Sequence, residues 1–412
     1  MQSLSQSERQ ILRDLAKRQA EIAGTPHMRQ LVADWYAHND LKGSRPMFTV
    51  ESWTFQQDIP LETARCESPF ARDIEHALLL RLANHQYVKD DTVVPDVFPV
   101  GVSSWFKPFG LEVKRQELTG SIGHQFVHQI KDLEDDFHLL GPSVWGSSGM
   151  AAAQARVADV NEVFGDILPA QLVGSSLYAV PTQDIVHLMG LENLMFSMAD
   201  YPELFHRMMD QLTDDYVAYH RWLETEGLLL PTTSYGGVGN GTYAYTHDLP
   251  DQGPVTVGQV WGFMDSQETV GFSPASFEEF IFPYYRKVAE KYGLLSYGCC
   301  EPVDPFWDSC LAKLDNLRKV SISPWCNEAF IGERLRGTKT IYHRKPSPNY
   351  LGVGVELDEA AWRSHIETTL KAAKGCKLEF SQRDVYTVSG NLPKIGQLID
   401  IARDAIERHW EG

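Results

Sequence analysis

The sequence has few basic residues relative to its acidic ones. Its 412 residues include 37 lysines and arginines against 55 aspartates and glutamates, which gives a formal net charge of −18 at pH 7. Nucleic acids and anionic membrane surfaces attract proteins through basic patches. We therefore expect neither as a partner, and a strongly anionic substrate would need locally placed arginine and lysine.

Long apolar runs and cysteines are also scarce. No stretch approaches the ~20 consecutive apolar residues that a membrane-spanning helix requires. The amino-terminal residues are polar and lack the apolar core of a secretory signal, which predicts a cytoplasmic location with reduced thiols. Six cysteines in so long a chain do not suggest a disulfide framework, so packing, metal binding and catalysis are left as their uses.

Helical and strand patterns alternate along most of the chain. Helices are predicted over residues 4–23 and 28–38, ahead of a first short strand at 47–50. Further strands are predicted at 93–100, 171–180, 228–235, 257–264, 294–300, 317–323, 340–343 and 377–380. Such alternation is typical of a parallel sheet covered by helices, and eight strands close naturally into a barrel.

The predicted fold class is therefore α/β, as a distorted (β/α)8 TIM barrel over residues 46–412. Residues 1–45 form a predicted N-terminal helical extension. In such barrels the functional site lies at the carboxyl ends of the strands. Polar and thiol side chains do follow successive predicted strands: Asp265, Gln267 and Glu268, then Cys299, Cys300 and Glu301, then Cys326, then Arg344 and Lys345.

The segment 294–302 combines an apolar strand with two adjacent cysteines and a carboxylate. Side chains alternate along a strand, so Cys299 and Glu301 share one face and Cys300 points the other way. Zinc takes three or four sulfur, nitrogen or oxygen ligands, and Cys299 or Cys300, Glu301, Cys326 and Glu268 could supply them. The alternative is that the thiols pack as small apolar groups and Glu268 leads a helix.

Other residues are candidates for substrate contacts. Arg344 and Lys345 could clamp a carboxylate, although a surface basic pair is the competing interpretation. We expect the substrate-binding pocket to be lined by the side chains of Tyr235, Trp261, Gln267 and Trp325. The glycine-rich segment 236–241 lacks the spacing of a phosphate-binding loop and is predicted to be a mobile connection. His124 and His128 would share a helix face, and we expect them to be packed or exposed and not to bind metal.

Several motifs resemble those of the uroporphyrinogen decarboxylase superfamily, within the branch found with corrinoid methyltransferase systems. The similarity extends over most of residues 30–408. Its most specific segments are Tyr297-Gly298-Cys299-Cys300-Glu301-Pro302, Ser321-Ile322-Ser323-Pro324-Trp325 and Arg344-Lys345-Pro346. The others are Trp35 with Asn39, Arg45-Pro46, Gly190-Leu191-Glu192, Tyr201-Pro202-Glu203, Ser266-Gln267-Glu268-Thr269-Val270-Gly271, Ser273-Pro274, Glu279-Phe280 and Pro283-Tyr284.

This resemblance implies a zinc-dependent methyltransferase or demethylase. It would move a methyl group from a small O- or N-methylated substrate to a corrinoid protein, a partner that carries the cobalamin. The implied site has Asp265, Glu268 and Arg344 as catalytic residues and Cys299, Cys300, Glu301 and Cys326 as metal ligands. Tyr297-Gly298-Cys299 takes the place of the branch's His-x-Cys pair, so the ligand set is a variant one.

The alternative function is a uroporphyrinogen decarboxylase-like carboxy-lyase without metal. In it Arg344 and Lys345 would hold carboxylates and Asp265 would protonate the ring. The arginine-bearing string Arg-Gln-Ala-Gly-Arg of the true decarboxylases does not occur in this sequence, which disfavours a porphyrinogen substrate. A homodimer is compatible with the sequence but is not required by it.

Overall fold

A parallel sheet forms the centre of the molecule. The computed structural model describes residues 4–117 and 124–411. Seven strands pair in the order β1-β15-β14-β13-β12-β11-β8, and all of their pairings are parallel. Their bounds are Met47–Val50 (β1), Leu177–Ala179 (β8), Trp261–Met264 (β11), Leu294–Tyr297 (β12), Leu317–Ile322 (β13), Ile341–Arg344 (β14) and Leu378–Gln382 (β15).

A second parallel pair extends this order. Strand β2 (Phe98–Val100) pairs with β7 (Ala170–Leu172), and β7 leads within a few residues into β8. The parallel strands thus follow the sequential order of a (β/α)8 barrel, with a seam between β1 and β2. No hydrogen-bonded β1–β2 pair occurs among residues 4–117, so the α/β class is confirmed and closure of the barrel stays a prediction.

Two aspartates occupy the seam beside β1. The Val50 N–H donates to Asp90 Oδ2 at 2.6 Å, and the Phe48 N–H donates to Asp91 Oδ2 at 2.8 Å. The Asp91 N–H in turn donates to the Phe48 carbonyl at 2.9 Å. Buried backbone groups need hydrogen-bond partners, and these side chains supply them where a neighbouring strand would otherwise do so.

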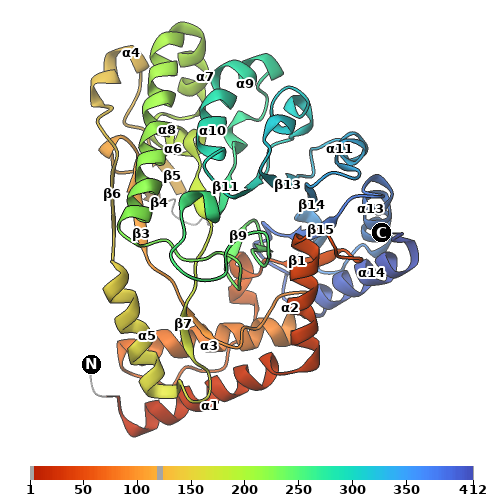
Figure 1. The fold of residues 1–412 in the computed structure, drawn as a ribbon. Coiled ribbons are helices and arrows are strands. Elements are labelled where there is room, and N and C mark those ends of the chain that lie inside the picture. Colours follow the sequence, from red (N-terminus) through yellow and green to blue (C-terminus); the bar gives the residue numbers. More distant parts are fainter. Residues whose placement is uncertain (1–3, 118–123, 412) are drawn as a thin grey trace.

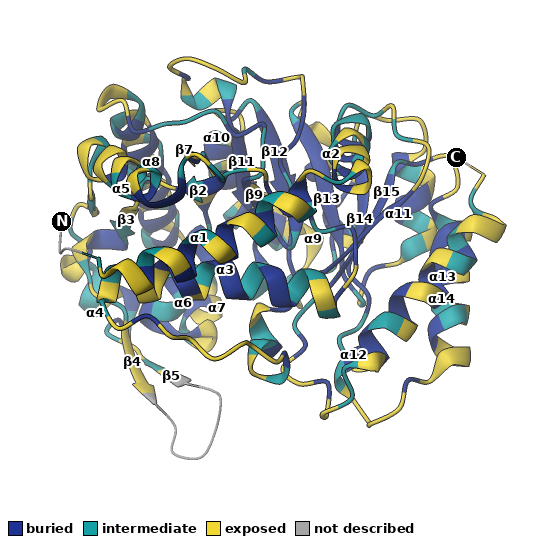
Figure 2. Cartoon of the chain, turned by 90° about the horizontal axis from the view of Figure 1, so that it is seen from below, coloured by how far each residue is buried: buried dark blue, intermediate teal, exposed yellow. Residues whose placement is uncertain are grey.

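Helices cover the outside of the sheet, with exposed residues on their outer faces and buried strands within (Figures 1 and 2). Helix α1 packs against α3 and α5, and the long α8 packs against α10. The helix bounds are Gln6–Ala23 (α1), Pro26–Asn39 (α2), Pro69–Tyr87 (α3), Leu133–Asp136 (α4), Met150–Phe164 (α5), Pro181–Met189 (α6), Leu191–Asp200 (α7), Pro202–Thr225 (α8), Pro274–Phe280 (α9), Phe282–Ala289 (α10), Glu328–Leu335 (α11), Asn349–Gly352 (α12), Glu359–Ala372 (α13) and Pro393–His409 (α14). Among the described residues, no helix is both long enough and apolar enough to cross a membrane.

Two antiparallel pairs of strands lie outside the central sheet. Strand β3 (Ser104–Lys107) pairs with β6 (Val144–Ser147), and β4 (Lys114–Glu117) pairs with β5 (His124–Val127). The prediction that His124 and His128 share a helix face is therefore wrong, because β pairing places His124 on a strand. His128 follows that strand and packs against Gly190, where an added Cβ would lie 2.6 Å from its ring.

The glycine-rich segment enters the interior of the sheet. The predicted strand at 228–235 is wrong, since these residues are irregular. The chain forms instead the hairpin β9 (Gly237–Gly239) and β10 (Thr242–Tyr243), which lies between the labelled strands β11 and β1 (Figure 1). Gly239 has a φ of +111°, and a Cβ there would lie 2.5 Å from the Phe263 ring. Glycine is required for this close packing, and the segment is not the mobile connection that its composition predicts.

Replacing Gly239 with alanine should therefore destabilise the protein. Overpacking a well-filled interior costs about 1–3 kcal/mol, in addition to about 1 kcal/mol for a left-handed residue that carries a Cβ. The matched control is Gly253→Ala, because Gly253 has a φ of +78° with nothing within 4 Å of its Cβ position. Urea unfolding should show the larger loss for Gly239→Ala. Equal losses would mean that the hairpin is not packed as described.

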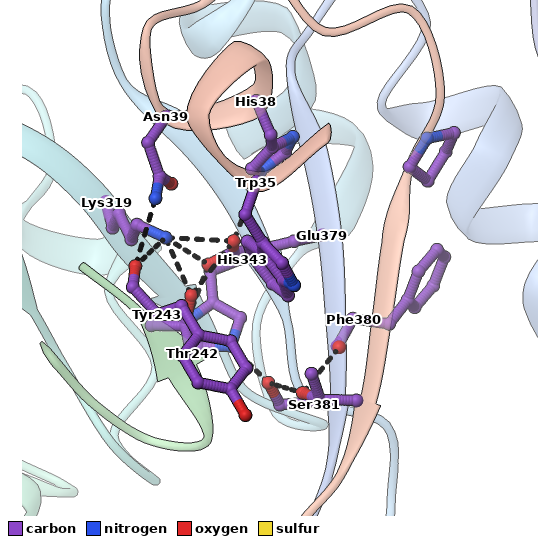
Figure 3. A network of polar contacts seen from close by, with 12 residues as sticks. Trp35, His38, Asn39, Thr242, Tyr243, Lys319, His343, Glu379, Phe380 and Ser381 are labelled. Atoms are coloured by element: carbon purple, nitrogen blue, oxygen red, sulfur yellow. Dashed lines mark hydrogen bonds and ion pairs between the residues drawn. The ribbon is translucent and has the colours of Figure 1, made fainter. Parts of the chain in front are cut away.

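A buried polar network joins this hairpin, helix α2 and the sheet (Figure 3). Lys319 of β13 is fully buried, and its Nζ lies 3.0 Å from Glu379 Oε2 on β15 and donates to Thr242 Oγ1 at 2.6 Å. His38 Nε2 of α2 lies 3.1 Å from the same Glu379 oxygen, and His343 Nδ1 lies 3.5 Å from Glu379 Oε1. Helix α2 is thus joined to the sheet through His38.

Protonation within the network follows from burial and from the ion pair. Burial alone would raise the pKa of Glu379, but the Lys319 ammonium and the neighbouring histidines lower it overall. Burial lowers the pKa of His343 to about 3 and also lowers that of His38. The network therefore holds one ammonium and one carboxylate with two neutral imidazoles.

Candidate functional site

Residues from three strand ends meet at the carboxyl edge of the sheet. The loop after β12 carries Cys299 and Cys300, whose Sγ atoms are 3.7 Å apart. Lys345, which directly follows β14, places its Nζ 3.4 Å from Cys299 Sγ and 3.7 Å from Cys300 Sγ. The lysine is 2% exposed and also lies 3.7 Å from Asp384 Oδ2 beyond β15. We call Cys299, Cys300 and Lys345 the thiol cluster.

The two thiols share a proton unequally. The hydrogen bond from Cys299 lowers the pKa of Cys300 to about 6, and the Lys345 ammonium acts in the same direction. That hydrogen bond and burial raise the pKa of Cys299. The cluster therefore presents Cys300, the less buried of the pair, as its thiolate.

Asp265 follows β11 and is the second reactive group of the site. It is 5% exposed, and its Oδ1 has no hydrogen-bond partner among the described residues. Burial raises its pKa well above the usual range, and the carboxylates of Glu301 and Glu268 act in the same direction. Burial thus favours the neutral, protonated form of Asp265, although the Lys345 ammonium acts against that rise.

Glu268 lies beside this acid on the short helix η5 (Gln267–Thr269). Its Oε2 accepts a hydrogen bond from Thr182 Oγ1 at 2.9 Å. Burial raises its pKa, and Gln267, which is half-buried, acts against that rise through a hydrogen bond. The two predicted residues Gln267 and Glu268 therefore lie together near Asp265.

Three other predicted residues hold the strand ends in place. Glu301 is fully buried, and its two oxygens accept from the N–H groups of Ser266 at 2.8 Å and Cys299 at 2.9 Å. Arg344 donates to the Ser323 carbonyl at 2.6 Å and pairs with Glu328 at 2.7 Å.

The third of them, Cys326, has its Sγ 3.4 Å from the Val303 nitrogen and 3.5 Å from Ser323 Oγ. Burial raises the pKa of this thiol. Cys326 therefore packs as a neutral buried side chain. Glu301 and Arg344 support the strand ends through their hydrogen bonds with the backbone.

These contacts decide how well the predicted zinc ligands fit. Within the described ranges no group of three or more histidine, cysteine, aspartate or glutamate side chains is arranged to hold a metal ion. Cys299 and Cys300 do come together, but an ammonium lies against both, while Glu301 and Cys326 are engaged elsewhere. The predicted four-residue ligand set does not fit these positions, and zinc binding stays a prediction from the sequence.

The aromatic residues that were predicted to contact the substrate lie in different parts of the structure. Trp261 is fully buried at the start of β11, away from the carboxyl edge, and donates from Nε1 to the Ala244 carbonyl at 3.0 Å. Trp325 lies on the loop after β13 and is 72% exposed. Tyr235 lines a cavity of about 530 Å³ between β1 and the inner hairpin.

That cavity leads to residues that the sequence patterns do not identify. Glu51, Tyr178 and Asn240 line it as well. Arg383, just beyond β15, places its Nε 3.1 Å from Glu51 Oε2 and donates to the Asn240 side chain. Glu51 and Arg383 each directly follow a strand of the central sheet. Their position at the end of a strand was the one sequence signal that could have identified them as candidate site residues.

A hexapeptide before β6 has the Asp-x-His-x-x-Gly spacing of cobalamin-binding motifs: Asp136-Phe137-His138-Leu139-Leu140-Gly141. Asp136 Oδ2 accepts from the Lys131 N–H at 2.8 Å, and His138 Nδ1 lies 2.9 Å from the Asp135 carbonyl. Short motifs need a matching structural context. Both polar residues here serve a local turn, so the spacing alone does not assign a cobalamin to this chain.

Proteins with an α/β fold carry their ligand sites at the carboxyl ends of the parallel strands. The polar residues of this chain gather at that edge. No family model and no curated protein matches the sequence. Among solved structures, the chain is similar to a methyltransferase from Methanosarcina mazei, with 14% sequence identity and a TM-score of 0.52. The similarity covers 91% of this chain and 98% of that one. At this identity it shows a shared fold.

Proposed function

We propose that the chain is a methyltransferase that takes a methyl group from a small O- or N-methylated compound. The fold it shares with a methyltransferase supports this proposal. So does the position of Asp265 and the thiol cluster at the carboxyl edge, where an α/β sheet presents reactive groups. The uroporphyrinogen decarboxylase-like resemblance of the sequence motifs points to the same chemistry.

The observation that carries the proposal is the buried carboxyl group of Asp265, whose pKa is raised and whose Oδ1 has no hydrogen-bond partner among the described residues. When a nucleophile attacks the methyl carbon of an ether, the carbon–oxygen bond breaks and the oxygen leaves with the electron pair. An acid that protonates this oxygen makes it a far better leaving group, and such general acid catalysis contributes about 10²–10⁴-fold. The raised pKa of Asp265 favours the protonated form that this role needs, and its buried Oδ1 makes no hydrogen bond to the described residues.

The thiol cluster forms the other wall of the proposed site. Asp265 lies close enough to Cys299 and Cys300 for their charges to affect one another. Sulfur is polarizable and packs well against a methyl group, and the Lys345 ammonium holds both sulfur atoms in place. We assign Cys300 and Lys345 to substrate positioning next to the acid.

The methyl acceptor in this proposal is a separate corrinoid protein. Methyl transfer from an ether or amine needs a strong nucleophile, and reduced cobalt would supply it. The partner would approach the carboxyl edge, where Trp53 and Trp325 are 66% and 72% exposed on loops after β1 and β13. Zinc is not part of the proposed reaction, because the predicted ligands do not fit.

A metal-free carboxy-lyase is the second candidate, and the raised pKa of Asp265, near the Lys345 ammonium, is the observation that favours it. Such an enzyme would have to grip the carboxylates of its substrate with basic groups. Arg344 is engaged with Glu328 and two backbone carbonyls, and Arg383 is paired with Glu51. Lys345 lies against the two thiols and Asp384, and Arg383 also pairs with Asp384 at 3.3 Å. Each of these three basic groups is therefore already engaged, so we favour methyl transfer.

Product analysis separates the two candidates. The purified chain should release no demethylated product from aryl methyl ethers or methylamines by itself, and product should appear once a reduced corrinoid protein is added. Carbon dioxide released from a carboxylated substrate without any corrinoid would instead establish the carboxy-lyase. A Cys326→Ser variant should retain the wild-type behaviour, because Cys326 only packs behind the strand ends.

A further inference from the structure

A second cavity lies apart from the thiol cluster, between β3, helix α8 and the loop that joins β7 to β8. Its volume is about 310 Å³. Phe106, Tyr178, Asp184, Tyr216, Tyr219 and His220 are among its lining residues. Lysine and arginine side chains are absent from its described lining, so the cavity is unsuited to phosphate or carboxylate ligands.

Asp184 gives this cavity an acidic group without a cationic partner. The Tyr216 hydroxyl donates to its carboxyl group, and no lysine, arginine or histidine pairs with Asp184 among the described residues. Burial raises the pKa of Asp184 to about 7, and the neighbouring Glu268 acts in the same direction. A buried carboxylate is costly unless a cation compensates it.

His220 provides a second polar group, one ring nitrogen of which makes no hydrogen bond to the described residues. It is 1% exposed and lines the cavity. Its Nδ1 lies 3.4 Å from the Tyr292 hydroxyl, and its Nε2 has no hydrogen-bond partner within the described part of the chain. Burial lowers its pKa to about 4, with the Tyr178 backbone carbonyl acting against this, so the ring is neutral. A neutral imidazole nitrogen can exchange a hydrogen bond with a hydroxyl group.

Aromatic rings complete the lining next to these two groups. Phe106 stacks on Tyr216 with ring centroids 4.3 Å apart, and Tyr219 lies 5.3 Å from Phe106. Tyr216 is also 5.9 Å from His220, on the next turn of α8. Aromatic rings attract organic cations, and quaternary ammonium groups are commonly bound in this way.

We infer that this cavity binds a small ammonium compound that carries a hydroxyl group. Its cationic end pairs with Asp184 among the rings of Phe106, Tyr216 and Tyr219, and its hydroxyl group reaches the free nitrogen of His220. The volume suits a ligand of a few carbon atoms. This binding site does not depend on the proposed methyl transfer, and Tyr178 separates it from the cavity that borders Glu51 and Asn240.

Calorimetric titration of the full chain in mildly alkaline buffer tests the inference with two probes of one shape. Choline carries the charge and the hydroxyl group, and 3,3-dimethylbutan-1-ol is its neutral counterpart. Choline should bind roughly tenfold or more tightly than the neutral probe, because losing one partner of a buried charge pair is costly. Asp184→Asn should remove that preference.

Two further variants keep the test decisive if Asp184→Asn folds poorly. Leu229→Trp fills the cavity from its wall and should abolish choline binding, whereas Lys374→Met changes an exposed residue outside the cavity and should bind choline as the wild type does. The inference fails if no binding of choline is detected, if both probes bind equally, or if choline binds to Leu229→Trp with unchanged affinity. Methyl-transfer activity has no bearing on these outcomes.

Discussion

Replacing Asp265 with asparagine should slow methyl transfer from O-methylated substrates by about 10²–10⁴-fold, the usual contribution of a positioned general acid. Asparagine has nearly the shape of the neutral acid, but it cannot give up a proton to the leaving oxygen. Steady-state rates with a reduced corrinoid protein measure the effect. Since Asp265 Oδ1 has no partner within the described residues, the substitution should leave the fold intact.

A quaternary ammonium donor supplies the matched control for this variant. Its amine leaves as a neutral molecule and needs no proton, so Asp265→Asn should slow that reaction far less than ether cleavage. The rate with ethers should also fall as pH rises through the raised pKa of Asp265, because only the protonated acid is active. An equal loss with both donors would assign Asp265 a structural role and contradict the proposal.

Replacing Lys319 with methionine should be the most destabilising of the single substitutions discussed. Removing one partner of a buried ion pair costs about 3–5 kcal/mol, because the other charge is left uncompensated. Here Glu379 would keep the neutral His38 and His343 and the hydroxyl of Thr242 beside it. Urea unfolding, followed by circular dichroism, gives the change in the free energy of unfolding.

Two comparisons isolate the buried pair. The double variant Lys319→Met/Glu379→Gln should recover part of the loss, since it removes both charges. Lys374→Met, which breaks an exposed pair with Glu411, should change stability by less than about 1 kcal/mol. If Lys319→Met were as mild as Lys374→Met, the network of Figure 3 would not hold the hairpin and α2 to the sheet.

The stability contributed by Glu379 should also depend on pH. Its folded-state pKa lies below its unfolded value, so this contribution is fully present above the unfolded pKa of about 4.3. It is lost as pH falls through the folded-state pKa. In Glu379→Gln the acid side of the stability profile should therefore be flatter than in the wild type.

Strand periodicity predicted most of the sheet, because buried parallel strands read as short apolar runs. The run at 228–235 has the same composition but is irregular, because β8 and β12 already pair with the two sides of β11. Local sequence could not reveal that Gly239 packs on Phe263. Only the tertiary structure shows why glycine is needed there.

Part of the candidate site could likewise be predicted from the sequence, because it lies at the ends of the predicted strands. Strand-end position brought out Asp265, the two thiols and Lys345, which do lie together. It could not separate them from Glu301 and Arg344, because whether a charged side chain faces a ligand or the backbone depends on contacts between distant loops. The buried pair of Lys319 and Glu379 was likewise hidden, since its partners are 60 residues apart in the chain.

Single-turnover transfer of a ¹³C-labelled methyl group from an aryl methyl ether tests the central claim most directly. The purified chain, the ether and a reduced corrinoid protein are mixed, and nuclear magnetic resonance follows the label. The account predicts that the label appears on the cobalt of the partner at a rate that Asp265→Asn lowers by about 10²–10⁴-fold and that Cys326→Ser leaves unchanged. Label that stays on the ether with every variant, or that moves equally fast without Asp265, would contradict it.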